Sequence, residues 1–138
     1  HTPDDFVVAT GRTTEIREFV RMSFAEMGIL IEFVGRGVDE KGFITSFDNT
    51  LFESMTGLKA DLNKVGQAVV HVDPRYFRPT EVDLLIGNPA KIKNALGWEP
   101  EYTLESLVKE MIFSDMSDAK KEALLKDNNY FVRNNYGE

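Results

Sequence analysis

The side chains with the most potential for chemistry lie in residues 72–83, which read VDPRYFRPTEVD. A guanidinium offers paired N–H donors that match phosphate oxygens, so Arg75 and Arg78 are candidate phosphate ligands. Glu81 follows Arg78 by three residues, where its carboxylate could accept hydrogen bonds from the vicinal hydroxyls of a ribose. The alternative is an ion pair between Arg78 and Glu81 that closes a surface loop and contributes only ~0–1 kcal/mol.

The groups that usually carry out reactions are missing. Gly35 and Gly37 resemble the start of a dinucleotide fingerprint, but Glu40 occupies the place of its third glycine, and no P-loop sequence is present. The two histidines, His1 and His71, are far apart in sequence, and we expect His71 to have a structural or surface role. None of the tyrosines precedes a lysine by four residues, as in short-chain dehydrogenases, and no cysteine is present for thiolate chemistry or metal binding. The sequence therefore predicts binding groups rather than reacting groups.

Composition narrows the class of protein. The 138 residues carry a net charge of -7 and are 42% hydrophobic, which predicts one folded domain over residues 1–138 and disfavours nucleic-acid binding. The longest apolar run, residues 27–31, is far shorter than the ~20 residues of a membrane span, so we expect no membrane partner. No secretion signal is visible at the N-terminus, which favours a cytoplasmic protein. The N-terminal residues also resemble the middle of a longer gene product.

The first half of the chain should position these groups through a strand, a helix and a second strand. The β-branched run at residues 6–10 predicts a buried strand, and an amphipathic helix follows, capped by Thr13 or Thr14 and ended by Gly28. Residues 29–34 form the next strand, so the unit has the size of a right-handed crossover. The signals are weak over residues 43–66, so we expect an irregular excursion there.

The second half predicts one more strand and then helices. A strand over residues 67–72 leads directly into the arginine-rich stretch. Asn88 and Pro89 start a helix that ends at Gly97, and its expected inner face consists of Ile92, Ala95 and Leu96. Thr103 caps a further helix, Ser117 caps a last one, and residues 128–138 form a flexible tail. The expected fold is α/β, a small mixed sheet with flanking helices.

Several motifs together resemble the C-terminal part of the GDP-mannose 4,6-dehydratases, members of the extended short-chain dehydrogenase family. The most specific is the run YFRPTEV at residues 76–82. The other matching segments, in collinear order, are residues 5–11, 33–42, 87–91 and 96–100. Residues 45–64 match no pattern of the family that we can place.

The resemblance implies the substrate-binding half of an NADP-dependent lyase in GDP-fucose biosynthesis, dimeric or tetrameric when complete. Such enzymes convert GDP-mannose to GDP-4-keto-6-deoxymannose: they oxidise C4 of the mannosyl group, eliminate water across C5 and C6, and return the hydride to C6. By motif, Arg78 would face the GDP diphosphate and Glu81 would hold the ribose, while Arg75 is a weaker candidate because relatives carry lysine there.

The resemblance also implies that the cofactor-binding Rossmann half and its catalytic residues lie upstream of this chain. We therefore expect this chain to bind no NADP and to be inactive alone. Two alternatives remain open, namely the substrate domain of another nucleotide-sugar epimerase or dehydratase, and a non-catalytic binding module.

Overall fold

The computed structural model describes residues 3–78 and 85–130, and these residues contain a three-stranded sheet. The strands β1 (Ile29–Val34), β2 (Lys41–Phe47) and β3 (Ala68–His71) lie in the order β1-β2-β3. Both pairings are antiparallel, so the α/β class is confirmed but the predicted mixed sheet is wrong. The short turn between β1 and β2 explains this, because closely spaced strands pair as a hairpin.

Two isoleucines opposite each other form the inner face of the sheet. The register pairs Ile31 of β1 with Ile44 of β2, and each is only 4% exposed. Cross-strand pairs of this kind stabilise a sheet and fix its register, because a slip of one strand by one residue would turn its isoleucine to the other face.

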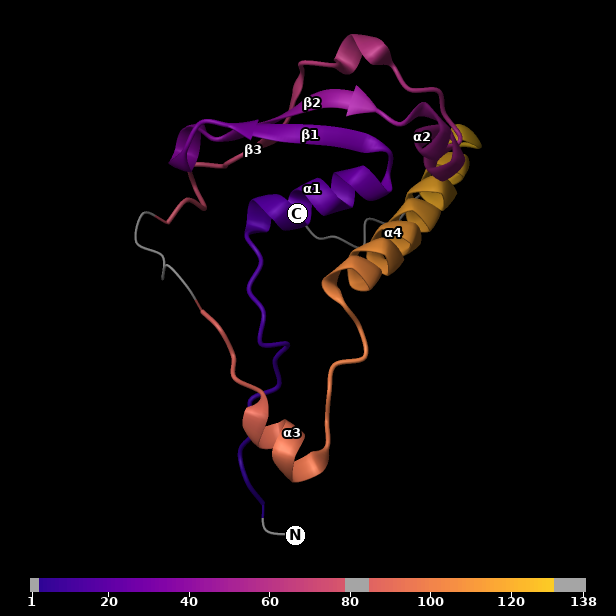
Figure 1. The fold of residues 1–138 in the computed structure, drawn as a ribbon. Coiled ribbons are helices and arrows are strands. Elements are labelled where there is room, and N and C mark those ends of the chain that lie inside the picture. The colour runs from indigo at the N-terminus through magenta and orange to yellow at the C-terminus, as the bar shows by residue number, and fades with distance from the viewer. Residues whose placement is uncertain (1–2, 79–84, 131–138) are drawn as a thin grey trace.

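Helices lie beneath the sheet in two layers (Figure 1). The helix α1 (Ile16–Glu26) packs under β1, and the long α4 (Leu104–Asp127) crosses α1 on the side away from the sheet. The short α2 (Asn49–Thr56) contacts α4. Val108 of α4 is 1% exposed, so this side chain is packed on all sides.

The C-terminal end of α1 agrees with the sequence prediction, and its N-terminal cap differs from it. Gly28 follows the end of the helix at φ +75, and a Cβ there would lie 2.6 Å from the backbone nitrogen of Phe52, so only glycine fits. Glu15 occupies the N-cap position without a capping side-chain bond. The predicted cap at Thr13 or Thr14 is therefore wrong.

The predicted strand at residues 6–10 is not a strand in this chain. The segment has no ladder partner among the described residues, so the predicted crossover to β1 is absent. In Figure 1 it rises as an extended trace from the N-terminus towards α1.

Residues 43–66 are more regular than predicted. They contain most of β2, all of α2 and the 3₁₀ turn η2 (Leu62–Lys64). The Asp48 carboxylate accepts from the Leu51 N–H at 3.0 Å and caps α2, and Gly57 ends the helix at φ +76. These local signals were present in the sequence, but the pairing of β2 with strands on both sides decides its structure.

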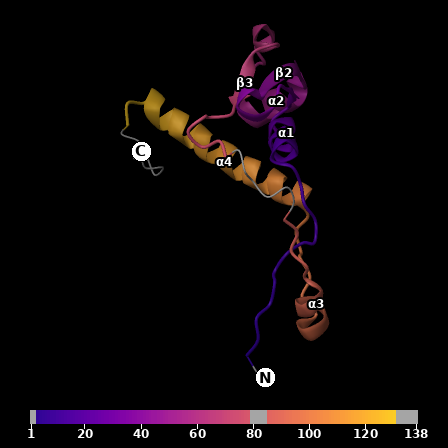
Figure 2. The ribbon, with the colours of Figure 1, turned by 90° about the vertical axis from the view of Figure 1, so that its left-hand side faces the viewer.

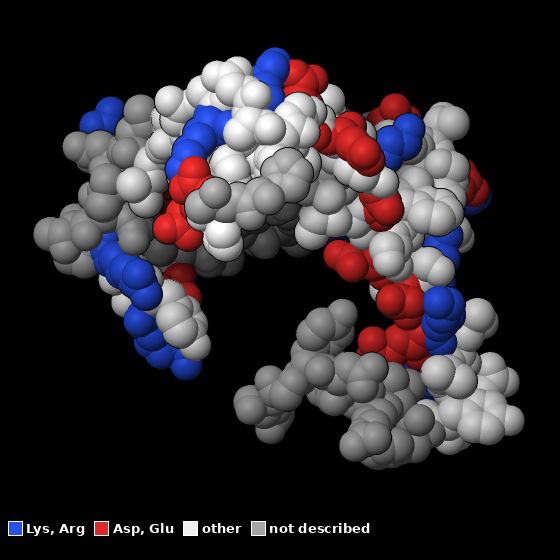
Figure 3. Space-filling view, turned by 90° about the horizontal axis from the view of Figure 1, so that it is seen from below, with Lys and Arg blue, Asp and Glu red and all other residues white. Residues whose placement is uncertain are grey.

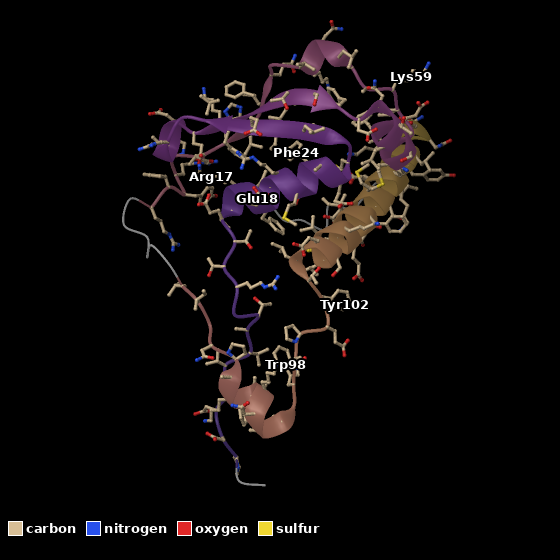
Figure 4. The ribbon with its side chains drawn as sticks, viewed as in Figure 1. Arg17, Glu18, Phe24, Lys59, Trp98 and Tyr102 are labelled. Atoms are coloured by element: carbon tan, nitrogen blue, oxygen red, sulfur yellow. The ribbon has the colours of Figure 1, made fainter. Side chains whose placement is uncertain are left out.

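The helix α3 (Ala90–Leu96) forms where the sequence predicts it. The Asn88 side chain accepts from the Ala90 N–H at 3.0 Å, and Trp98 lies half-buried next to the helix (Figure 4). Ile92 is buried, but Ala95 and Leu96 are exposed, so only one residue of the predicted inner face is correct. Figure 2 shows the reason for this exposure, because α3 lies below the sheet and apart from the other helices.

The predicted last two helices are a single one. Thr103 and Ser106 form a capping box at the start of α4, as the sequence indicates for Thr103. Ser117 lies inside the helix and does not cap a new one, because no glycine or proline interrupts residues 104–127. Most of the predicted tail, residues 131–138, lies outside the described residues. Within the described ranges, no helix is long and apolar enough to cross a membrane.

Candidate functional site

The arginine-rich loop begins with a tight turn immediately after β3. The Tyr76 N–H donates to the Asp73 carbonyl at 3.0 Å, and the Arg75 N–H donates to the Asp73 carboxylate at 2.9 Å. Pro74 occupies the second position of this turn, where its fixed φ is favourable.

Arg75 is engaged by its own loop. Its Nη2 lies 2.7 Å from Oδ2 of Asp73, its Nε donates to the same carboxylate, and its guanidinium lies 5.6 Å from the centre of the Tyr76 ring. The hydrogen bond from Arg75 lowers the pKa of Asp73, and Asp73 raises the pKa of Arg75. The Arg75 side chain is 79% exposed, so an incoming phosphate can reach it but must compete with Asp73.

A glycine turn supports the loop from the side. The turn between β1 and β2 contains η1 (Gly37–Asp39), and a Cβ on Gly37 would lie 3.4 Å from the Phe77 ring. Gly35 is held at φ +96, where a Cβ would lie 2.7 Å from the Asp39 carbonyl oxygen. The two glycines that resemble part of a cofactor fingerprint thus serve to fold a turn against which Phe77 packs.

An ion pair connects this turn to α1. Arg17 Nη1 lies 3.2 Å from Oε1 of Glu40, whose side chain is only 16% exposed. Figure 4 shows Arg17 near the N-terminal end of α1, on the side where the sheet ends in the loop. Three elements therefore support residues 73–78: β3 leads into the loop, the η1 turn contacts Phe77, and α1 holds the turn. The roles of Gly37, Glu40 and Arg17 were not predicted from the sequence, although the closely spaced glycines were a visible signal of a turn.

Of the two remaining predicted ligands, Arg78 and Glu81, only Arg78 lies within the described residues. Arg78 is exposed and follows Phe77 directly. Glu81 lies outside the described residues, as does the predicted ion pair between Arg78 and Glu81. The structure thus brings Arg75 and Arg78 into one exposed loop beyond β3.

A hollow that the sequence did not predict lies away from this loop, between the N-terminal segment and the start of α4. It has a volume of about 760 Å³, and its lining includes Arg12, Thr14, Tyr102 and Glu105. The pKa of Glu105 is lowered, first by its own backbone N–H and then by Thr103 and Arg12. This end of α4 therefore favours a charged carboxylate.

The described residues contain no cluster that could bind a metal, and the surface of α4 carries mixed charge (Figure 3). No group of three or more His, Asp or Glu residues there could hold a metal ion. Figure 3 shows acidic and basic side chains interleaved along the arm that α4 forms. Two close pairs on that helix, Lys121 with Asp118 at 2.8 Å and Lys126 with Glu122 at 2.6 Å, illustrate the same mixing.

Comparisons with known proteins point to one family. Residues 1–111 match the family described as GDP-mannose 4,6 dehydratase. The chain is 49% identical over 130 residues to the GDP-mannose 4,6-dehydratase of Vibrio cholerae serotype O1, a match that covers 94% of this chain and 33% of the relative. Identity to the Yersinia enterocolitica enzyme of the same name is 48%, with the same coverage. GDP-mannose 4,6 dehydratase 2 of Caenorhabditis elegans is 45% identical over 84% of this chain and 25% of its own length. The chain thus spans about a third or less of each of these relatives.

Proposed function

We propose, from the premise that this chain belongs to the GDP-mannose 4,6-dehydratase family, that it is the nucleotide-sugar-binding portion of an enzyme that dehydrates GDP-mannose to GDP-4-keto-6-deoxymannose. The observation that carries the proposal is the family match over residues 1–111, which includes the whole arginine-rich loop. A nucleotide-sugar substrate fits this loop because its diphosphate is a natural partner for guanidinium groups.

In this proposal each predicted residue has one task. Arg78 binds the diphosphate, Glu81 accepts from the ribose hydroxyls, and Arg75 is a secondary phosphate contact that exchanges part of its bonding with Asp73. Binding energy from the nucleotide, which does not react, positions the hexose for the chemical steps. The loop therefore contributes binding and orientation.

The proposed cofactor, NADP, would bind outside this chain. The glycine turn at residues 35–40 does not fit a dinucleotide, because Phe77 packs beside Gly37 and the Asp39 carbonyl closes against Gly35. The hydride transfers, the lyase chemistry and assembly into an oligomer accordingly belong to the complete enzyme. By resemblance, its cofactor-binding half precedes this chain, and we expect the isolated chain to be inactive.

The test is calorimetric titration of the complete protein with GDP-mannose. Arg78→Ala removes a charge-assisted contact to phosphate and should weaken binding by about 2 kcal/mol, or roughly 30-fold. Lys59→Ala is the control, since it also removes one exposed positive charge but lies at the other end of the sheet from Arg17 (Figure 4). Unchanged affinity in a folded Arg78→Ala protein would remove Arg78 from the site.

A further inference from the structure

The turn between β1 and β2 is joined to α1 at one residue, Glu40. The Glu40 N–H donates to the Gly37 carbonyl at 3.3 Å and closes the 3₁₀ turn η1. Its carboxylate Oε1 lies 3.2 Å from Nη1 of Arg17, near the start of α1 (Figure 4). Glu40 therefore links the position of the turn to the position of the helix.

The ion pair of Glu40 is more enclosed than those of Arg21, the other arginine of α1. The Glu40 side chain is 16% exposed, whereas Glu18 and Glu32, which both pair with Arg21, are 51% and 63% exposed. Attraction between opposite charges increases as water is excluded, so an enclosed pair holds its two elements more firmly than an exposed one. The pair between Glu40 and Arg17 is thus suited to fix the turn in one place.

One route from Glu40 to the arginine-rich loop passes through η1. Glu40 is bonded to Gly37, and a Cβ on Gly37 would lie 3.4 Å from Cζ and 3.7 Å from Cε2 of the Phe77 ring. Arg78 follows Phe77 directly in the chain. A displacement of the turn would therefore remove the surface on which the residue before Arg78 rests.

A second route passes through the sheet. Lys41, the residue after Glu40, is the register partner of His71 in β3. His71 precedes Asp73, the first residue of the turn that begins the loop, by only two positions. A displacement of Glu40 would therefore reach the loop at its start as well as at Phe77.

The position of the loop matters because its two guanidinium groups are carried by long side chains at the surface. Arg75 is 79% exposed, and Arg78 is exposed as well. Ordering such side chains around a ligand costs entropy, and a backbone that is already in place lowers this cost. A loop released from the turn would present the same charges in many positions and would bind a diphosphate more weakly.

We infer that Glu40 is a positioning residue: its carboxylate, held by Arg17, fixes the η1 turn on which Phe77 rests and so places Arg78 for the diphosphate of the substrate. The inference rests on the proposed function, which assigns the diphosphate to Arg78. It adds that an ion pair between the turn and α1 sets the affinity for the substrate through the loop.

The direct test is the steady-state kinetics of the complete protein with GDP-mannose. Glu40→Gln keeps the shape of the side chain and removes its charge, so KM should rise about 10-fold while kcat stays within about 2-fold, because the loop binds a part of the substrate that does not react. Glu32→Gln is the matched control, since it breaks the ion pair between Arg21 and the interior of β1, and it should leave KM unchanged. An unchanged KM in Glu40→Gln, or an equal rise in both variants, would overturn the inference.

A double-mutant cycle distinguishes positioning from a general loss of stability. Glu40→Gln should weaken GDP-mannose binding about 10-fold when Arg78 is present and no more than about 3-fold in an Arg78→Ala background, because the two residues act in one chain of contacts. The same loss in both backgrounds would overturn the inference, since Glu40 would then affect binding without Arg78.

Arg17 supplies a second pair of variants that leaves the Glu40 carboxylate intact. Arg17→Met removes the positive charge and should raise KM by about the same factor as Glu40→Gln. Arg17→Lys keeps a point charge near Glu40 and should stay within about 3-fold of the unsubstituted protein. Equal KM values for the two Arg17 variants would overturn the inference.

The affinity of Arg78→Ala alone separates this inference from the proposed function. Unchanged affinity in that variant removes the diphosphate contact and overturns both. Weakened binding in Arg78→Ala together with unchanged binding in Glu40→Gln retains the proposed function and overturns only the positioning role.

Discussion

The substitution Gly35→Ala tests whether the turn beside the arginine-rich loop is built as the structure indicates. Gly35 has φ +96, and an added Cβ would lie 2.7 Å from the Asp39 carbonyl oxygen. Gly57 is the matched control, because it has φ +76 and a Cβ there would meet nothing within 4 Å. Alanine at either site is strained by its positive φ, but only at Gly35 does it also collide with backbone.

The structure sets the expected size of the difference. The positive φ costs roughly 1–2 kcal/mol at either position, and the loss of chain entropy in the unfolded state offsets a similar part of this cost at both. At Gly35 the collision must be relieved by moving backbone about 0.7 Å, from 2.7 Å to the ordinary contact distance of 3.4 Å. Overpacking of this kind costs typically ~1–3 kcal/mol, so Gly35→Ala should be about 2 kcal/mol more destabilising than Gly57→Ala.

Urea unfolding of the complete protein measures this difference as a shift in midpoint at unchanged m-value. Because Phe77 packs on the same turn, Gly35→Ala should also weaken binding of GDP-mannose, whereas Gly57→Ala should not. Equal unfolding midpoints for the two variants would refute the close approach at Gly35. Equal affinities would refute the claim that the turn supports the loop.

Three further outcomes follow from the packing, the helix cap and the charge pairs. Val108→Ala should lower the free energy of unfolding by about 2 kcal/mol, because Val108 is 1% exposed. Val34 is 63% exposed, so Val34→Ala should change this free energy by less than ~0.5 kcal/mol. Equal losses of unfolding free energy in urea denaturation of the two variants would contradict the packing. Thr103→Ala should cost about 1 kcal/mol by the same measurement, since it removes the cap of α4, and no change would show that the capping box contributes nothing. The pKa of Asp73 is lowered from its ordinary value of 3.8, so its bond to Arg75 should stabilise the loop above that pH and be lost as the pH falls below it. An NMR titration of the Asp73 carboxyl that gives an ordinary or raised pKa would contradict the bond.

The sequence predicted best the elements that depend on local signals. The helices α1 and α3 and the capped start of α4 have amphipathic patterns, capping side chains or terminal glycines within a few residues. β1 and β3 were also predicted, because short apolar runs end at turn residues. In each case the information lies within the element itself.

The errors arose where distant contacts decide the structure. Phe43, Ile44 and Thr45 of β2 favour a strand. This run is short and bordered by polar residues, and its pairing with β1 and β3 on both sides decides its structure. Ser117 is a common capping residue, yet it lies inside α4 because nothing nearby breaks the helix. Residues 6–10 have a strong strand pattern without a ladder, since no partner strand is present in the described chain.

Part of the candidate site could be found from residue types and part could not. Arg75 and Arg78 were visible because two guanidinium groups follow a strand. The bonds between Arg75 and Asp73, and the packing of Phe77 on Gly37, depend on how the loop folds back on a turn that precedes it by about forty residues in the chain. Side-chain spacing alone carries no information about such contacts.

The most direct test of the central proposal is turnover by the complete protein of GDP-mannose and, in parallel, of UDP- and dTDP-sugars. We expect conversion of GDP-mannose to its 4-keto-6-deoxy product and little or no reaction of the other sugar nucleotides. Turnover of a UDP- or dTDP-sugar without turnover of GDP-mannose would contradict the proposed function.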